Sequence, residues 1–180
     1  MLGCWIGDTL IPTKNHVERE ENNVENGRTP AFSRTEMTEL VVPGDSNQLG
    51  NILGGRLMHW IDLAAAITAA RHAGHVAVTA SMDSLEFLHP VRVGQVVKLI
   101  AQVNWVGRTS MEIGVDVYRE DLRDPDVKKT STAYLTFVAL NDNGKPIEVP
   151  RLILETEEEI ERFHQAEQRR KIRLEHRQRI

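Results

Sequence analysis

The spacing of hydrophobic residues in the centre of the chain predicts one long, buried helix. From about Gly54 to His72 the segment consists largely of good helix formers, and Gly74 supplies a stop just after it. Its apolar positions fall first on one helical face and then on the others: Leu57, Ile61, Ala64, Ala65 and Thr68, followed by Trp60, Leu63, Ile67 and Ala70. An apolar surface nearly all round is typical of a helix that is buried on every side.

Strand-like runs surround this helix in the sequence. One run precedes it and four follow it without another helix between them: residues 35–42, 76–88, 95–106, 110–120 and 128–140. We expect a loop over residues 121–126 between the last two runs. This order predicts an antiparallel sheet that covers one face of the helix, an α+β layer architecture. Since one sheet cannot cover a helix that is apolar all round, we expect a second copy of the chain, and therefore at least a dimer.

The two ends of the chain differ from this central part, so the expected division is 1–34, 35–154 and 155–180. Residues 1–34 are polar and rich in Asn and Glu, with prolines and a glycine as breakers, and predict a flexible extension of little value to the core. The last segment predicts a helix with glutamates in its first turns and arginines at its end, which complements the helix dipole. We expect this helix to be solvated and to pack at the outside of the assembly.

Composition excludes several classes of function. With 180 residues, 41% hydrophobic and 27% charged, the chain is long enough for one ordinary soluble domain. A net charge of -4, and a basic end without interleaved aromatic residues, give no argument for a nucleic-acid partner. The single cysteine, Cys4, excludes an internal disulfide framework and a cysteine-based metal site, and no set of His, Asp and Glu has metal-ligand spacing.

Hydropathy gives no sign of a membrane partner. The start of the sequence lacks the basic segment and the apolar stretch of a signal peptide. No run of about 18 apolar residues is present that would cross a bilayer. We therefore expect a cytoplasmic location without membrane attachment.

Asp62 is the residue that fits its predicted surroundings least. It lies in the middle of the apolar helix, where a carboxylate has poor helix propensity and a large desolvation cost unless it is compensated. Such a group could act as a general base or as a nucleophile. It could instead face a water-filled interface or pair with Arg56 or His59, although we expect His59 to be a partly buried structural residue.

Four segments together resemble the acyl-CoA thioesterases of the hot-dog fold, in the single-domain branch similar to the bacterial and brain-type acyl-CoA hydrolases. They are Gly50 to Gly55, the helix with Asp62, Asp83 to Gly94, and Trp105 to Ser110, in this order and spacing. The resemblance covers roughly residues 35–140. One departure is Leu53, because the family often has a histidine immediately before the glycine pair.

The resemblance implies a long helix wrapped by an antiparallel sheet, two protomers that share a continuous sheet, and three such dimers in a homohexamer. It implies hydrolysis of a fatty acyl-CoA to a free fatty acid and CoA, without a metal or organic cofactor. Asp62 would match the family's helix carboxylate, and Asn51 the asparagine that works with it from the partner chain. Thr109 and Ser110 would contact CoA, and Arg108, at a turn between strands, is the first candidate for contact with a phosphate.

The glycine pair before the helix adds a second chemical element. Gly54 and Gly55 open the helix, where unpaired N–H groups and the positive dipole end can bind an oxyanion. Tight packing or turn geometry would also explain the pair. Asp62 follows Gly55 at about 10 Å along the helix axis, at about 1.5 Å per residue, so one thioester carbon cannot contact both in a single chain. We therefore expect Asn51 and Gly55 of one protomer to meet Asp62 of another, unless Asn51 is only a helix cap.

Two other functions remain open at this point. A hot-dog hydratase or dehydratase would act on acyl-CoA or acyl carrier protein, but it needs a His paired with an acid, and no His-Phe-Pro-type entry to the helix is present. A non-catalytic acyl-CoA sensor would usually carry a DNA-binding segment, and residues 1–34 are too polar and too broken for a helix-turn-helix.

Overall fold

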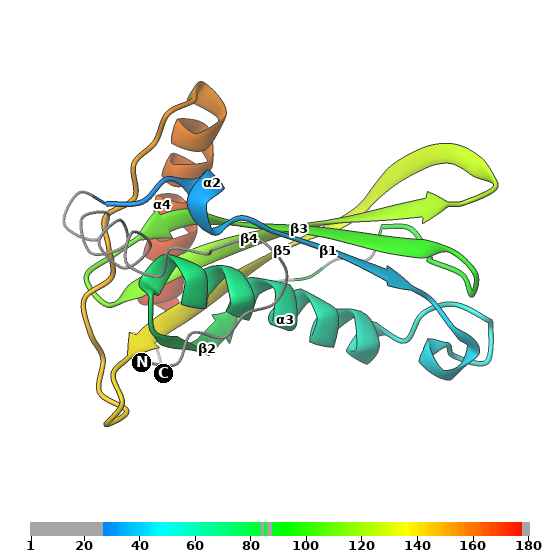
Figure 1. Ribbon diagram of the computed structural model, residues 1–180, viewed down its shortest axis with the longest axis horizontal. Coiled ribbons are helices and arrows are strands. Elements are labelled where there is room, and N and C mark those ends of the chain that lie inside the picture. Colours follow the sequence, from blue (N-terminus) through cyan, green and yellow to red (C-terminus); the bar gives the residue numbers. More distant parts are fainter. Residues whose placement is uncertain (1–26, 84, 86–87, 178–180) are drawn as a thin grey trace, which may run out of the picture.

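The computed structural model describes residues 27–83, 85 and 88–177 (Figure 1), so most of the expected N-terminal extension lies outside the described residues. In chain order the elements are α2 (Pro30–Ser33), β1 (Thr35–Leu40), the 3-10 helix η1 (Pro43–Asp45), α3 (Gly54–Ala73), β2 (Val76–Met82), β3 (Val96–Val106), β4 (Ser110–Asp121), β5 (Asp124–Leu140) and α4 (Glu157–Arg177). The predicted order of one strand, a long helix and four strands is confirmed. Among the described helices, none is long and apolar enough to cross a membrane.

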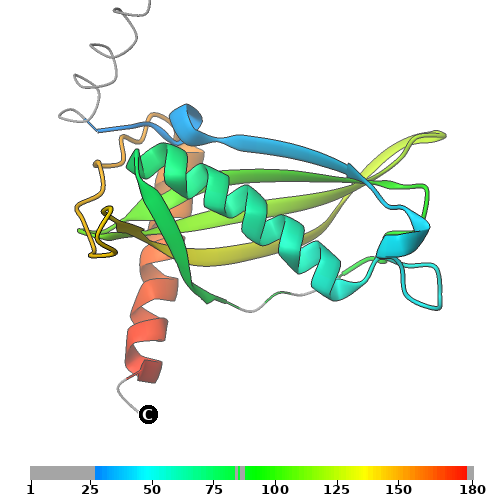
Figure 2. The same ribbon diagram turned by 60° about the horizontal axis from the view of Figure 1, so that its bottom comes forward.

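The five strands form one antiparallel sheet in the order β1-β3-β4-β5-β2. Side chains alternate between its two faces, with α3 lying across one face and α4 packed on the other (Figures 1 and 2). The α3 face of the three central strands is fully buried in the core: Val97, Leu99, Ala101, Val103, Met111, Ile113, Val115, Val117, Ala133, Leu135, Phe137 and Ala139. A long helix wrapped by an antiparallel sheet confirms the predicted hot-dog architecture.

Two of the predicted strand boundaries are wrong. β5 begins at Asp124, which pairs with Asp121, so two residues replace the expected loop over 121–126. β2 ends at Met82, although Asp83 and Leu88 still donate backbone hydrogen bonds to carbonyl oxygens of β5 at 2.9 and 3.0 Å. Backbone pairing therefore extends β5 beyond its alternating hydrophobic run, and keeps Asp83 and Leu88 beside β5 after the end of β2.

Local residues explain where α3 begins and ends. Leu53 is the N-cap, in an extended conformation and without a side-chain cap bond, so the alternative in which Asn51 caps the helix is wrong. At the other end Gly74 has a φ of 71°, and its N–H donates to the Ala70 carbonyl at 2.8 Å. Because this left-handed conformation strongly favours glycine, the predicted stop is confirmed with its physical reason.

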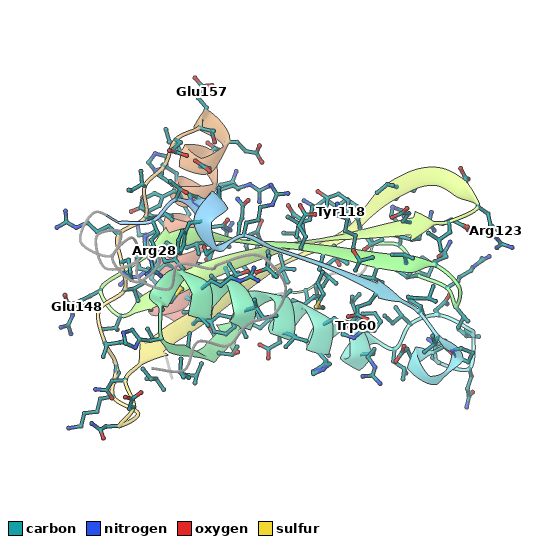
Figure 3. The ribbon with its side chains drawn as sticks, viewed as in Figure 1. Arg28, Trp60, Tyr118, Arg123, Glu148 and Glu157 are labelled. Atoms are coloured by element: carbon teal, nitrogen blue, oxygen red, sulfur yellow. The ribbon has the colours of Figure 1, made fainter. Side chains whose placement is uncertain are left out.

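Residues 28–33 make contacts with the folded part of the chain on the N-terminal side of the expected boundary at residue 34. Arg28 lies at the C-terminal end of α3 (Figure 3), where its Nη1 donates to the carbonyl oxygens of Arg71 and His72 at 2.6 and 2.8 Å. A cation at this end of a helix is favourable. Ser33 at the end of α2 is fully buried, with its hydroxyl 3.4 Å from Nδ1 of His72. Composition alone did not reveal that these polar groups satisfy the end of a buried helix.

The burial of His72 makes the stability of the fold sensitive to acid. Its Nε2 lies 3.3 Å from the Pro150 carbonyl oxygen, and burial, assisted by the charge of Arg28, lowers its pKa from 6.5 to about 4. Below pH 6.5 the unfolded chain binds a proton that the folded chain does not, so stability is complete above pH 6.5 and declines as the pH falls toward 4. We expect the free energy of unfolding to be about 2 kcal/mol lower at pH 5 than at pH 7 through this group.

Urea unfolding at the two pH values measures this difference in stability. In a His72→Gln variant the difference should shrink by most of that amount, whatever the stability of the variant at pH 7. In the control His59→Gln, whose ring is exposed in the parent, the difference should stay as in the parent. An unchanged difference in the His72 variant would assign the acid sensitivity to other groups.

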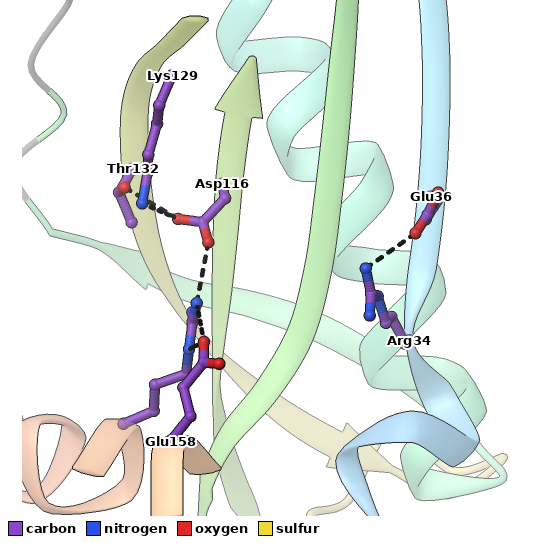
Figure 4. Close-up of polar contacts among 7 residues, drawn as sticks. Arg34, Glu36, Asp116, Lys129, Thr132 and Glu158 are labelled. Atoms are coloured by element: carbon purple, nitrogen blue, oxygen red, sulfur yellow. Dashed lines mark hydrogen bonds and ion pairs between the residues drawn. The ribbon is translucent and has the colours of Figure 1, made fainter. Parts of the chain in front are cut away.

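α4 is fastened to the outer face of the sheet by ion pairs. Near its start, the carboxylate of Asp116 on β4 binds Lys129 at 2.7 Å, the Thr132 hydroxyl at 3.0 Å and Arg162 of α4 at 3.2 Å (Figure 4). Burial raises the pKa of Asp116, but the hydrogen bond and charge of Lys129, together with the charge of Arg162, outweigh it, so the pKa lies below its usual value.

The basic end of α4 is bound in the same way. Glu112 on β4 is fully buried, and its Oε1 accepts a 2.7 Å hydrogen bond from Nη2 of Arg169. Its Oε2 lies 3.5 Å from Nη1 of Arg173. Arg173 also binds Asp83 at 2.7 Å. The expectation of a solvated helix is therefore wrong for this face, because its acidic partners come from strands and a connecting segment far away in the sequence.

Candidate active site

Asp62 lies on the side of α3 that the sheet covers only in part. Its carboxylate is partly exposed, and its Oδ1 accepts a 2.7 Å hydrogen bond from the Thr79 hydroxyl on β2. Neither alternative partner pairs with it in the described part of the chain, since Arg56 pairs with Asp45 at 2.7 Å and no hydrogen bond or ion pair joins His59 to Asp62. The alternative of an intrahelical pair is therefore wrong, and so is the expected partial burial of His59, which is exposed. The carboxylate is oriented by a neutral hydroxyl and not by an opposite charge.

A β-bulge in β2 determines which way Thr79 faces. The pairing with β5 passes from Thr79 and Phe137 to Ser81 and Thr136, which makes Ala80 the extra residue. Phe137 is fully buried in the core beneath α3, whereas Thr136 is on the opposite face of β5. Because a shift of one residue exchanges the faces of a strand, the bulge directs Thr79 to the α3 side and Ser81 to the α4 side.

Exposed apolar residues lie near the carboxylate on α3 and on the neighbouring strand. Met58 and Leu63 of α3 are each 42% exposed, and on the opposite face of β2 Val76 and Val78 are 66% and 43% exposed. Among the strands that the structure describes, β2 is an outer one, so one of its edges has no neighbouring strand there. An exposed apolar helix face beside a free strand edge is a surface that normally has a partner. The prediction that one sheet leaves part of α3 uncovered is confirmed.

The N-terminus of α3 offers backbone donors. The N–H groups of Arg56 and Leu57 both donate to the Leu53 carbonyl, at 3.0 and 3.1 Å, so those of Gly54 and Gly55 are the ones without an acceptor within the helix. A Cβ added at Gly55 would meet nothing within 4 Å. Packing within the chain therefore does not explain Gly55, and a ligand can approach its backbone closely.

The loop before α3 brings two asparagines together. Oδ1 of Asn47 accepts hydrogen bonds from the N–H groups of Leu49 and Asn51 at 2.9 and 3.2 Å, and the Asn47 N–H donates to the Asn51 carbonyl at 2.7 Å. Gly50 between them has a φ of 73°, which a side chain would strain. Asn47 is thus a turn residue, and it holds Asn51 near the start of the helix.

Within one chain the predicted site residues remain in separate groups. Asn51 and Gly55 lie at one end of α3, and Asp62 lies about 10 Å further along the same unbroken helix. Thr109 and Ser110 line a cavity with residues of α4, on the other face of the sheet, and Arg108 is exposed on the same turn. A single chain therefore does not assemble the predicted site.

A carboxylate on a helix, beside the free edge of a sheet that wraps that helix, defines a protein of the hot-dog class. The sequence profile of the thioesterase superfamily matches residues 49–125. An uncharacterized acyl-CoA thioester hydrolase of Bacillus subtilis is 47% identical over 137 residues, which are 76% of this chain and 80% of that protein. The chain belongs to the acyl-CoA thioester hydrolases of the thioesterase superfamily.

Other similar proteins include longer relatives and solved structures. The cytosolic acyl coenzyme A thioester hydrolase of Rattus norvegicus is 36% identical over 143 residues, which are 78% of this chain but 38% of that protein. The acyl-CoA hydrolase of Staphylococcus aureus, solved with butyryl-CoA, CoA and CoA disulfide, is 38% identical with a TM-score of 0.79, covering 83% of this chain and 92% of that one. An apo-hexameric acyl-CoA thioesterase is 40% identical with a TM-score of 0.80, covering 83% and 96%.

Alanine variants of the Staphylococcus aureus enzyme are also among the similar structures. The substituted residues are an asparagine, an aspartate fifteen positions later, and a threonine seventeen positions after the aspartate. Here Asn47, Asp62 and Thr79 are the same residue types at the same separations. The sequence alone does not mark Thr79 as a site residue, because a threonine is ordinary in a strand. The sequence feature that could have identified it is the position of its hydroxyl, on the strand that directly follows the helix with Asp62.

Proposed function

We propose that the chain hydrolyses the thioester of a fatty acyl-CoA to a free fatty acid and CoA. The main support is the position of Asp62, which is bound by Thr79 and lies on the uncovered side of α3. A second copy of the chain that covers this side of α3 would bury the carboxylate at a cost in desolvation, which supports a catalytic role for it. The activity named for the relatives is the same.

The chemistry needs a base or nucleophile and donors for the oxyanion. Asp62 either takes a proton from the water that attacks the thioester carbon, or attacks that carbon itself. The C–S bond then breaks, and the sulfur leaves as the CoA thiol once it has received a proton. With water as the attacking group this releases the fatty acid directly, whereas direct attack leaves a mixed anhydride on Asp62, which a water then hydrolyses to the fatty acid and the free carboxylate. N–H groups at Gly54 and Gly55 stabilise the oxyanion, at about 10²–10³ in rate per donor. These groups suffice for hydrolysis, so we propose no metal or organic cofactor, with CoA only as part of substrate and product.

We place this site between two copies of the chain. Since Gly55 and Asp62 are about 10 Å apart on one helix, the N-terminus of α3 from one protomer meets Asp62 of the partner subunit. The free edge of β2, with Val76 and Val78 exposed, suits pairing with the same strand of a second copy. A hexameric relative supports three such dimers in a homohexamer.

The asparagine of the site comes from the loop before α3. The resemblance indicates Asn51, whereas the spacing shared with the Staphylococcus aureus variants favours Asn47. Oδ1 of Asn47 is already occupied by two backbone N–H groups, which leaves its amide N–H₂ for a water or a thioester oxygen. We therefore propose Asn47 as the first candidate and retain Asn51 as the second.

CoA recognition is assigned to the turn between β3 and β4. The exposed guanidinium of Arg108 suits a phosphate, and the hydroxyls of Thr109 and Ser110 line a cavity beside it. We propose a cytoplasmic location, supported by the cytosolic relative of Rattus norvegicus. We propose neither a nucleic-acid nor a membrane partner.

The direct test is release of free thiol from a panel of acyl-CoA substrates by the purified chain. Turnover of fatty acyl-CoA is the expected result. Binding of acyl-CoA without any turnover would favour the sensor. Hydration of an enoyl-CoA without thiol release would favour the hydratase.

A Thr79→Val variant should lower kcat by about tenfold or more, because a hydrogen bond to a charged group is lost and Asp62 is no longer held in one orientation. The KM should change little, since Thr79 acts on the carboxylate and not on CoA. Thr79→Ser keeps the hydroxyl and should keep most of the activity. Steady-state thiol release measures both constants, and equal kcat values for the valine and serine variants would speak against a positioning role.

A further inference from the structure

The residue that directly follows β2 binds α4 on the outer face of the sheet. Oδ2 of Asp83 accepts a 2.7 Å hydrogen bond from Nη1 of Arg173, and the two side chains are each 20% exposed. Partial burial strengthens such an ion pair, because salt screens it less than a pair on the surface. The backbone is held as well, since the Asp83 N–H donates to the Tyr134 carbonyl of β5 at 2.9 Å. The end of β2 is thus fixed both to the neighbouring strand and to α4.

Asp83 and Thr79 face opposite sides of the sheet. Thr79 binds Asp62 on the α3 side at 2.7 Å, whereas Asp83 binds α4. The two residues are four positions apart, and in a regular strand residues separated by an even number share one face. The bulge at Ala80 adds one residue and reverses the alternation, so that Met82 packs against the core and Asp83 faces α4. The two contacts therefore coexist only with the bulge in place.

This geometry makes the two contacts depend on each other. In a strand without the bulge, an Asp83 that faces α4 would place Thr79 on the same side, away from the carboxylate of Asp62. A bulge leaves its extra residue unpaired and disrupts the ladder locally, so it needs contacts that favour it. The ion pair with Arg173 is such a contact on the α4 side, as the hydrogen bond of Thr79 is on the α3 side.

We propose that the ion pair between Asp83 and Arg173 positions the active site. It fixes the register of β2 beyond the bulge and so keeps the Thr79 hydroxyl on the carboxylate of Asp62. In this role Asp83 and Arg173 are positioning residues, because they act through Thr79 and not on the reacting atoms. The inference rests on the proposed function and deepens it, since it makes α4 a support of the catalytic carboxylate across the thickness of the sheet.

An Asp83→Ala variant tests this role without changing a residue assigned to catalysis. Its kcat for thiol release should fall by about threefold to tenfold, because Thr79 then orients Asp62 in only part of the molecules. The KM should change little, since Asp83 does not line the cavity at the turn between β3 and β4. Arg173 keeps a second carboxylate, Glu112 at 3.5 Å, so no guanidinium is left without a counter-charge.

A conservative substitution at the same position is the first check. Asp83→Asn keeps an acceptor oxygen for the guanidinium of Arg173 and should recover most of the kcat that is lost in Asp83→Ala. An unchanged kcat in Asp83→Ala would overturn the proposal. An equal loss in the alanine and asparagine variants would overturn it as well, because the contact with Arg173 would then not be the cause.

The double variant Asp83→Ala/Thr79→Val shows whether the ion pair acts through Thr79. Its kcat should equal that of Thr79→Val, because the hydroxyl that the ion pair positions is already absent. A further fall by the same factor as in Asp83→Ala alone would show an independent effect and overturn the proposal. The matched control is Arg162→Gln, which removes another ion pair between α4 and the sheet, at 3.2 Å to Asp116 of β4, and should leave kcat unchanged. A loss in this control equal to that in Asp83→Ala would assign the effect to looser packing of α4 and also overturn the proposal.

Amide hydrogen exchange separates this proposal from the proposed function. Measured by mass spectrometry, exchange over residues 76–83 should be faster in Asp83→Ala than in the parent and unchanged in Arg162→Gln, because only the first variant releases the end of β2. Exchange equal to that of the parent in Asp83→Ala would overturn the positioning of β2 and leave the hydrolase assignment intact. If the parent released no thiol at all, the proposed function would fail, and exchange would still decide whether α4 fixes this strand.

Discussion

Replacing Asp62 by asparagine is expected to lower kcat for thiol release from an acyl-CoA by at least about a hundredfold, with the fold retained. The amide keeps the size of the side chain and an oxygen that can accept from the Thr79 hydroxyl, which lies 2.7 Å from Oδ1 in the parent. It can neither take a proton from water nor attack a thioester. The loss therefore measures the chemical role of the carboxylate and not its place in the packing.

The matched control is His59→Gln, one helical turn before Asp62 and exposed on the same helix, which should keep most of the activity. Saturating acyl-CoA isolates kcat, and a thermal unfolding curve of each variant checks that the fold is intact. A positioned catalytic group should change kcat far more than KM. Comparable rates in Asp62→Asn and the parent would remove this carboxylate from the mechanism.

Hydrophobic spacing predicts most of the fold because the core is built from regular elements. α3 is apolar on nearly every side, and the central strands alternate strictly enough to place their buried face, so the layer order follows from the sequence. The bulges at Ala80 in β2 and at Asn104 in β3 do not follow, since neither residue differs in type from its neighbours in a way that marks an extra position. The bulge in β2 decides which of its side chains face α3 and which face α4, and so it decides the details of the site.

The sequence marks one polar residue of the site but not the polar residues that contact it or the ends of its helix. Asp62 is detectable because a carboxylate in an apolar helix conflicts with its own surroundings. Thr79, which binds Asp62, is an ordinary residue type for a strand and so is not marked by its surroundings. Arg28 belongs to a segment whose composition resembles a flexible tail. Each of these contacts joins residues far apart in the chain, and one sequence contains no signal for such a pair.

Glu112 is the strongest case of this kind. On β4 it alternates with apolar residues, as a solvent-facing glutamate would, and the arginines that bind it lie in a helix that reads as solvated. In the structure its side chain is fully buried, and Nη2 of Arg169 lies 2.7 Å from Oε1. The guanidinium of Arg169 also stacks 3.6 Å over the ring of Tyr134. A charge that appears solvated in the sequence is therefore part of the attachment of α4 to the sheet.

Glu112→Ala should lower the free energy of unfolding by about 3–5 kcal/mol, because it leaves the largely buried guanidinium of Arg169 without its counter-charge. Arg173 loses less, since it keeps Asp83 at 2.7 Å. Urea unfolding gives the value. Glu158→Ala is the matched control, because its carboxylate also binds an arginine of α4 but is 76% exposed, and it should cost less than about 1 kcal/mol.

The double variant Glu112→Leu/Arg169→Leu separates the two ways in which this pair could contribute. A buried ion pair can often be replaced by apolar side chains at little cost, so the double variant should recover most of the stability lost in Glu112→Leu alone. Recovery would mean that the single variant is unstable because a charge is left uncompensated, and the cycle of single and double variants gives the coupling between the two side chains. Should Glu112→Ala prove no less stable than Glu158→Ala, the attachment of α4 would depend on apolar contacts and on Asp116, and not on this pair.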